Sequence, residues 1–303
     1  EMGNCCSRRF YEEENGRLKF RLIGGRRYHN ISNSVYAVPN DDEEAERLIG
    51  VNLDLYHFKA VKTIWGGLFN SPIEEKLQQG AKVIDIGCGT GTWLIDMARQ
   101  YPKSHFTGID FSPIFPTEGI PGNLQFIESN LLDGLLFGDF HFDFVHQKFM
   151  FVAFTQTQWE EKVIPELVRL TRPGGWIEIV EAEANLTSDG DSSKRFVNAF
   201  RDFMVSKEMN IEIEYIPSFL ENTGEFSEIR KEKKLVTLGK KGGAAGEATL
   251  NFFLKGIRHF RVWLPALMDI SPEHYDLLVD EILIEAEKGH TSVNQFRFCG
   301  HRK

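Results

Sequence analysis

The chain has 303 residues, of which 42% are hydrophobic and 26% are charged. At roughly 100–200 residues per domain, this length accommodates one elaborated domain or two small ones. No apolar run approaches the roughly 18 residues that a membrane-spanning helix requires. The formal net charge of −9 disfavours a general nucleic-acid-binding protein.

The charge is distributed unevenly along the chain. Residues 1–27 carry seven basic and four acidic residues, a net charge of +3, so the remainder carries −12. Within this basic leader, Met2–Arg9 reads "MGNCCSRR", which resembles the signal for myristoylation of Gly3. The modification requires Met2 to be the true start of the chain, and Glu1 precedes it. We therefore keep two hypotheses: a leader attached to a membrane surface, or a basic tail without fixed structure.

The sequence contains four cysteines: Cys5, Cys6, Cys88 and Cys299. Their spacing matches neither a disulfide framework nor a zinc site, and no secretory signal precedes them. We expect an intracellular, reducing environment in the cytoplasm, with the nucleus left open. Cys5 and Cys6 lie where palmitoylation would add further acyl chains to the leader.

Beyond the leader, the first regular pattern is an acidic helix that begins at Asn40 or Asp41 and ends before Gly66. Its apolar stripe consists of Leu48, Val51, Leu55, Phe58 and Val61. Short apolar runs then predict strands at 82–87, 105–110, 124–129, 142–147 and 176–183. Helices are predicted at 91–101 and 158–172, with a turn at Pro173–Gly175 before the fifth strand.

After residue 187 the pattern changes. We predict, in order, a helix at 192–209, a sixth strand at 228–239, a flexible glycine-rich loop at 239–246, helices at 250–264 and 272–289, and a seventh strand at 293–300. The fold class is therefore α/β: a doubly wound, seven-stranded, mostly parallel sheet with an N-terminal helical extension and a helical insertion between strands six and seven. The C-terminal ends of its parallel strands share one edge, where ligands bind.

The first predicted strand ends in "VIDIGCGTGTW", where Asp85 precedes three alternating glycines: Gly87, Gly89 and Gly91. A glycine-rich turn between a strand and a helix lets a ligand approach the backbone closely. A dinucleotide-binding turn would carry its third glycine at position 92, which is Thr92, so a nicotinamide-dependent oxidoreductase is disfavoured. A turn that binds nothing is the remaining alternative.

An acid two positions before strictly alternating glycines resembles the first motif of class I S-adenosylmethionine-dependent methyltransferases. The resemblance implies a Rossmann-like methyltransferase fold and S-adenosyl-L-methionine as the cofactor. It also implies that Asp85 faces the ammonium group of the cofactor, directly or through water. The backbone at Gly87, Cys88 and Gly89 would pass against the methionine tail, and Gly91 completes the turn. Cys88 stands where the family often has threonine.

The resemblance extends to the ends of the next strands. Asp110, nineteen residues past Gly91, would accept hydrogen bonds from both ribose hydroxyls, with a capping role as the alternative. Asn130 would bind the adenine amino group or only form a turn, and Leu131 would bracket the ring. His146 would contact the cofactor, act as a base, or be packed without chemistry. The text "HQKF" that starts there does not match the motif of methyltransferases that act on amide or adenine nitrogens.

Further blocks resemble the fungal LaeA-like methyltransferases. They are "YAVPNDDEEAERL" (36–48), "GGLFNSPI" (66–73), "GIDFSPIFP" (108–116), "FDFVHQ" (142–147) and "RPGGWIEIVE" (172–181). Together with the glycine motif they cover about residues 31–185. The implied organisation is a leader at 1–30 and one methyltransferase domain at 31–303. That domain would comprise a cofactor-binding core at 75–185, a substrate or lid region at 187–292 and a last strand at 293–301.

These features predict a methyltransferase that acts by in-line displacement on an unidentified small-molecule or protein acceptor. The alternative is a regulatory scaffold that binds the cofactor without turnover and works through protein partners. No catalytic residue is assigned, because the methyl donor is already activated and a general base is optional. His146, Glu181 and Glu183 are the base candidates, and no metal site is predicted. Tyr36 either caps the cofactor pocket or has a packing role.

Overall fold

The computed structural model describes residues 13–14, 17–18, 20–23, 26–30, 34–37, 39, 53–209 and 212–303. The acylation pattern at Met2–Arg9 and the first part of the predicted acidic helix lie outside these residues. The described part of that helix is α2 (Leu53–Trp65). None of the described helices is long and apolar enough to cross a bilayer.

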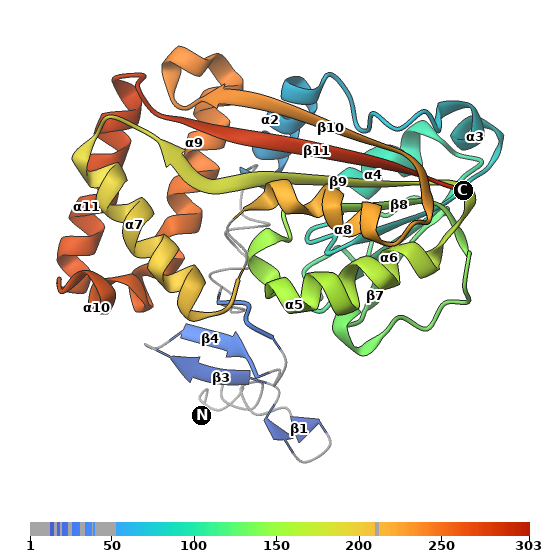
Figure 1. The fold of residues 1–303 in the computed structure, drawn as a ribbon, viewed down its shortest axis with the longest axis horizontal. Coiled ribbons are helices and arrows are strands. Elements are labelled where there is room, and N and C mark those ends of the chain that lie inside the picture. The colour runs from blue at the N-terminus through green and yellow to red at the C-terminus, as the bar shows by residue number, and fades with distance from the viewer. Residues whose placement is uncertain are drawn as a thin grey trace, which may run out of the picture.

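A seven-stranded sheet forms the centre of the fold, in the order β10-β11-β9-β8-β5-β6-β7 (Figure 1). Its strands are β5 (Lys82–Ile86), β6 (His105–Asp110), β7 (Leu124–Glu128), β8 (Phe142–Lys148), β9 (Thr171–Thr187), β10 (Phe226–Thr237) and β11 (Ser292–Arg302). Strands β5 to β9 pair in parallel, whereas β11 is antiparallel to both of its neighbours. The predicted seven-stranded, mostly parallel sheet is confirmed.

Helices cover both faces of this sheet. Helices α2, α3 (Glu74–Gln79) and α4 (Thr92–Gln100) bury side chains against one face. Helices α6 (Ile164–Leu170) and α8 (Ile216–Asn222) contribute to the cluster on the other face. The same cluster extends into a group of helices at one end of the sheet: α7 (Asp191–Ser206), α9 (Gly243–Arg258), α10 (Leu264–Met268) and α11 (Pro272–Glu287) (Figure 1). The predicted helical insertion between the sixth and seventh strands is therefore α9 to α11.

Two of the predicted helices are interrupted beside prolines. The helix expected at 158–172 consists of α5 (Gln156–Gln158), a π-helical turn (Trp159–Val163) and α6, and Pro165 lies in the first turn of α6. The helix expected at 250–264 ends at Arg258, and a 3₁₀ turn (His259–Val262) leads to α10 with Pro265 in its first turn. Proline has no backbone N–H to donate, so it is tolerated where a new helix begins and not inside one.

Two expected loops are part of regular elements. The turn predicted at Pro173–Gly175 lies inside β9. The pairing of β9 with β8 shifts register between Phe142 and Phe144 of β8, and this shift accommodates the extra residues of β9. The loop predicted as flexible at 239–246 contains a 3₁₀ turn (Lys240–Gly242) and the start of α9. A Cβ atom at Gly242 or Gly246 would collide with the carbonyl of Thr237, so these glycines permit close packing of α9 on β10.

The described N-terminal residues form short strands: β1 (Glu13–Glu14), β2 (Arg17–Leu18), β3 (Phe20–Ile23) and β4 (Arg26–His29). Strands β3 and β4 pair in antiparallel register. Tyr28 is buried and packs edge-on against Trp263, with ring centroids 6.0 Å apart. The Nε2 atom of His29 lies 2.8 Å from the hydroxyl of Ser112. Residues 26–29 thus pair with β3 and contact Trp263 and Ser112.

Candidate active site

The turn after β5 is built from three glycines in the left-handed region, where side chains are disfavoured: φ is +72° at Gly87, +56° at Gly89 and +73° at Gly91. Their surroundings differ. A Cβ atom at Gly87 would collide with the side chain of Met150, and one at Gly91 would collide with Phe126. A Cβ atom at Gly89 would meet nothing within 4 Å. Packing thus requires two of the glycines, whereas the third presents open space.

Asp110 ties this turn to the end of β6. Its Oδ2 accepts a hydrogen bond from the amide of Gly89 at 2.9 Å, and its Oδ1 accepts one from the amide of Ser112 at 2.8 Å. Burial raises the pKa of Asp110 to about 6, although these backbone hydrogen bonds act in the opposite direction. The carboxyl group is therefore ionised at neutral pH and becomes protonated under mildly acidic conditions.

A first cavity lies at the ends of β5, β6 and β7. Four of the predicted site residues line it: Gly87, Asp110, Asn130 and Leu131. The side chain of Asn130 caps the following 3₁₀ turn, because its Oδ1 accepts from the amide of Leu132 at 3.1 Å and its Nδ2 donates to Asp133 at 3.0 Å. This geometry matches the turn-forming alternative for Asn130, while Leu131 is a buried apolar wall.

Asp85 and His146 lie together away from this cavity lining. The Nδ1 atom of His146 is 2.7 Å from Oδ1 of Asp85, and both side chains are buried. The imidazole stacks on Trp93 with ring centroids 3.9 Å apart and an interplanar angle of 8°. The indole of Trp93 in turn donates to the carbonyl of Leu68 at 2.8 Å. This arrangement matches the hypothesis of a packed and oriented histidine.

Cys88 occupies the middle of the glycine turn. Burial, with the charges of Asp110 and Asp85, raises the pKa of its thiol well above the usual value. The thiol is therefore neutral and poorly nucleophilic. Within the described residues there is also no cluster of three or more histidine, cysteine, aspartate or glutamate side chains that could hold a metal ion.

A second, larger cavity of about 250 Å³ lies at the ends of β8 and β9. Two base candidates from the sequence, Glu181 and Glu183, line it together with Tyr36. Tyr36 also packs edge-on against Phe111 of the first cavity, with centroids 5.6 Å apart. Five phenylalanine side chains of the C-terminal region also line it: Phe196, Phe200, Phe252, Phe253 and Phe260.

Glu181 lies at the boundary between the two cavities. Its Oε1 accepts a hydrogen bond from the amide of Met150 at 2.8 Å, and the amide of Phe151 also bonds its carboxyl group. The preceding residue, Phe149, has φ of +55°, which turns consecutive amides toward one carboxylate. Met150 lines the first cavity and Phe151 the second. Burial raises the pKa of Glu181 to about 8 in spite of these hydrogen bonds.

The sequence interpretation missed Phe111 and Met150 in the first cavity, although both follow predicted strand ends, which was the available signal. It also missed Glu178, a buried side chain that accepts hydrogen bonds from the amides of Asn70 and Ser71 at 2.9 and 2.8 Å. The text "GGLFNSPI" contains both amides, so this block is held against β9 by a carboxylate. Nothing in the local pattern around Glu178 distinguishes it from the other acids of the same strand.

Comparison with known proteins agrees with this architecture. Residues 83–175 match the family described as methyltransferase domain. The N-methyltransferase verN of Clonostachys rogersoniana is 32% identical over 169 residues, which cover 54% of this chain and 55% of that protein. The secondary metabolism regulator LAE1 of Cochliobolus heterostrophus is 30% identical over 164 residues, covering 54% and 50%. The chain thus spans about half the length of the curated relatives it matches.

A solved structure supports the fold. A protein of Anabaena variabilis ATCC 29413, assigned as a methyltransferase from an antibiotic biosynthesis pathway, superposes with a TM-score of 0.50 at 15% identity. The match covers 80% of this chain and 98% of that one. The predicted Rossmann-like methyltransferase fold and the resemblance to LaeA-like sequences are both confirmed.

Proposed function

We propose that this chain, whose residues 83–175 carry a methyltransferase domain and which is similar to LaeA-like fungal proteins, is an S-adenosylmethionine-dependent methyltransferase. The observation that carries the proposal is the first cavity, where Asp110, Asn130 and Leu131 meet beside a left-handed glycine turn. The names of two relatives, N-methyltransferase verN and methyltransferase pytC of Aspergillus terreus, support the same reaction class.

The residues present fit the chemical groups of this cofactor. A carboxylate has about four acceptor positions, and two amides already bond Asp110, so it can also accept from ribose hydroxyls. The open space beside Gly89 gives the methionine tail a place against the backbone. Leu131 supplies an apolar surface for the adenine ring. Neither Asp85 nor His146 lines the first cavity. Asp85 would therefore act indirectly, on the glycine turn, through its bond to His146.

When bound, the cofactor supplies a methyl group on a positively charged sulfur. The main contribution of the protein is then alignment of the acceptor, which can lower a barrier by roughly 7–11 kcal/mol. Glu181 is the titratable group at the boundary between the two cavities. Because its pKa is about 8, its ionised form, which can accept a proton, becomes more abundant as the pH rises through 8. We therefore favour Glu181 over Glu183 and His146 as the general base.

Calorimetric titration with S-adenosylhomocysteine tests cofactor binding. We expect the wild-type chain to bind and Asp110→Ala to bind about a hundredfold more weakly, because a hydrogen bond to a charged group contributes about 1.5–3 kcal/mol. Asp96→Ala, on the exposed surface of α4, is the matched control and should bind as the wild type does. No heat with folded wild-type protein would refute the proposal, as would unchanged affinity in Asp110→Ala.

A second candidate function is regulation without turnover, since relatives at about 30% identity are named secondary metabolism regulators. Transfer of a tritiated methyl group from S-adenosylmethionine into components of a cell extract separates the two. Incorporation that disappears in Asp110→Ala supports the enzyme. Binding of S-adenosylhomocysteine with no incorporation supports the regulatory protein.

A further inference from the structure

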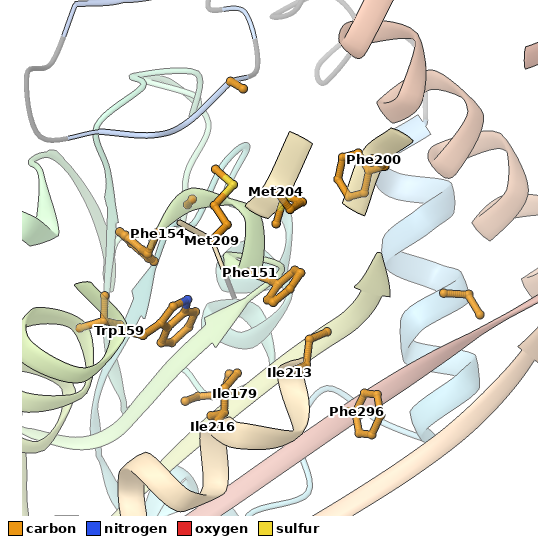
Figure 2. Packing of buried hydrophobic residues seen from close by; sticks show 14 of the residues in the cluster. Phe151, Phe154, Trp159, Ile179, Phe200, Met204, Met209, Ile213, Ile216 and Phe296 are labelled. Carbon is orange, nitrogen blue, oxygen red and sulfur yellow. The ribbon is translucent and has the colours of Figure 1, made fainter. Parts of the chain in front are cut away.

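The second cavity is walled mainly by aromatic rings. Seven phenylalanine side chains line it: Phe149, Phe151, Phe196, Phe200, Phe252, Phe253 and Phe260. Those of α7 and α9 pack on one another, with the Phe196 centroid 5.6 Å from Phe200 and 5.8 Å from Phe253. Figure 2 shows Phe151 and Phe200 within the buried cluster that surrounds this region. Such a wall favours flat apolar ligands, because aromatic rings gain from edge and offset contacts.

Polar side chains also line this apolar cavity. Gln295 on β11 is fully buried, lines the cavity, and has no hydrogen-bond partner for either amide atom within the described part of the chain. Leaving a buried amide unpaired is destabilising, because its hydrogen bonds to water are lost and not replaced. A ligand with a hydrogen-bonding group would remove that cost. Glu181 lines the same cavity, next to the first one.

We propose that this cavity binds the methyl acceptor, and that the acceptor is a small, neutral, aromatic compound with a hydroxyl or amine group. The inference rests on the proposed function and adds the substrate class to it. A cavity of about 150 Å³ holds benzene, so about 250 Å³ suits a compound of two fused rings. The carboxyl group of Glu183, which lines the cavity, disfavours an anion there.

The reaction in this cavity balances without a further reactant. The acceptor oxygen or nitrogen forms a bond to the methyl carbon, while the carbon–sulfur bond breaks and its electron pair stays on sulfur. The proton of the acceptor passes to Glu181 in its ionised form, which is more abundant as the pH rises through 8, and from there to solvent. Neither an oxidant nor a metal ion is needed for these bond changes.

Gly256 offers a way to fill the cavity without disturbing the fold. It lies in α9, lines the cavity and has an ordinary helical backbone, and a Cβ atom there would meet nothing within 4 Å. Replacing a helical glycine by leucine or alanine also favours the helix. Gly256→Leu should therefore fold and occupy the cavity, and Gly256→Ala is the smaller matched control.

The experiment is calorimetric binding of 2-naphthol, with 2-naphthoate as the anionic counterpart, to protein with and without saturating S-adenosylhomocysteine. We expect 2-naphthol to bind both the wild type and Gly256→Ala. Its affinity for Gly256→Leu should be at least about tenfold weaker than for the wild type. The affinity of 2-naphthoate for the wild type should likewise be at least about tenfold weaker than that of 2-naphthol. Gln295→Leu, which keeps the volume and removes the amide, should weaken 2-naphthol several-fold. Affinity for S-adenosylhomocysteine should be the same in all four proteins.

Two results would overturn the inference: no binding of 2-naphthol by the wild type, or equal binding by Gly256→Leu. Stronger binding of 2-naphthoate than of 2-naphthol would refute the predicted charge preference. Failure of the proposed function would look different, because S-adenosylhomocysteine would then not bind. The titration of 2-naphthol without it would still decide whether the cavity takes a neutral aromatic ligand.

Discussion

The two cavities are built in different ways. The first lies at the ends of β5, β6 and β7 and depends on backbone conformation: left-handed glycines and amides held by Asp110. The second is lined mostly by residues of β9, α7, α9 and β11 beyond the matched region 83–175, together with Phe149, Phe151 and Val152 inside it. If the first cavity binds the cofactor and the second the acceptor, as we propose, the first can persist through its backbone geometry while the second changes by side-chain substitution. The difference explains why the reaction class is easier to infer than the substrate.

The largest expected effect on stability comes from a substitution that disturbs the backbone geometry of the first cavity. Gly91→Ala should lower the free energy of unfolding by about 2–5 kcal/mol, because a left-handed alanine costs about 1–2 kcal/mol and overpacking against Phe126 about 1–3 more. Gly89→Ala, with open space beside it, should lose only the conformational part. Urea denaturation of both variants measures this. Equal losses would contradict the distinction between a packed and an open glycine.

The next effect concerns the carboxyl group between the cavities. The folded chain holds the proton of Glu181 up to about pH 8, whereas an unfolded glutamate releases it near its ordinary pKa of 4.5. The stability that this proton provides is therefore present at pH 4.5 and lost as pH rises through 8. Each unit of pKa difference corresponds to about 1.4 kcal/mol. As the pH rises from 4.5 to above 8, the free energy of unfolding of the wild type should therefore fall by a few kcal/mol relative to that of Glu181→Gln. Urea unfolding at several pH values measures this, with exposed Glu160→Gln as control.

A stability difference between wild type and Glu181→Gln that stays constant from pH 5 to pH 9 would contradict this prediction. It would mean that the carboxyl group titrates normally in the folded chain. Glu181 would then not serve as a proton acceptor tuned to neutral pH.

A smaller effect sharpens the role of Asp110 in the first cavity. Because the pKa of Asp110 is raised to about 6, its carboxylate becomes protonated between pH 7 and pH 5 and can no longer accept from two hydroxyls. Affinity for S-adenosylhomocysteine should fall about tenfold at pH 5. Asp110→Asn should bind weakly with no such pH dependence. A wild-type affinity that does not change with pH would argue against ribose recognition by this carboxylate.

The smallest effect distinguishes the two roles of Asn130. Loss of its cap in Asn130→Ala should reduce stability by about 1 kcal/mol. If Asn130 only forms the turn, affinity for S-adenosylhomocysteine should change less than about threefold. A larger loss of affinity would assign it to adenine recognition. Asn130→Asp, which keeps the capping oxygen, separates the two contributions by calorimetry.

The parallel core could be predicted from sequence because its strands are short apolar runs that end in polar or glycine residues. The glycine motif and Asp110 could be placed at one sheet edge for the same reason. The start of β9, before Trp176, could not, because Pro173–Gly175 reads as a turn and only pairing with β8 absorbs it as a bulge. The glycines of 239–246 likewise suggested flexibility, whereas they permit close contact with Thr237.

Most of the individual residues that line the second cavity could not be predicted, for a different reason. Its walls bring together Tyr36, Phe196 and Gln295, which are far apart in sequence and carry no shared motif. Long-range packing alone makes them neighbours. Glu181 was a candidate base from its place at a strand end, but its two bonded amides depend on the left-handed backbone of Phe149.

The insertion between β10 and β11 has a consequence for engineering. It begins and ends at adjacent, paired strands, since Val236 lies opposite Val293, so its two junctions are fixed close together by the sheet. A donor segment that preserves these junctions and the contact with α7 would exchange much of the aromatic wall in one step. If the two cavities have the roles proposed above, chimeras made by exchanging the β10–β11 insertion should take on the acceptor specificity of the donor and keep the cofactor affinity of the recipient.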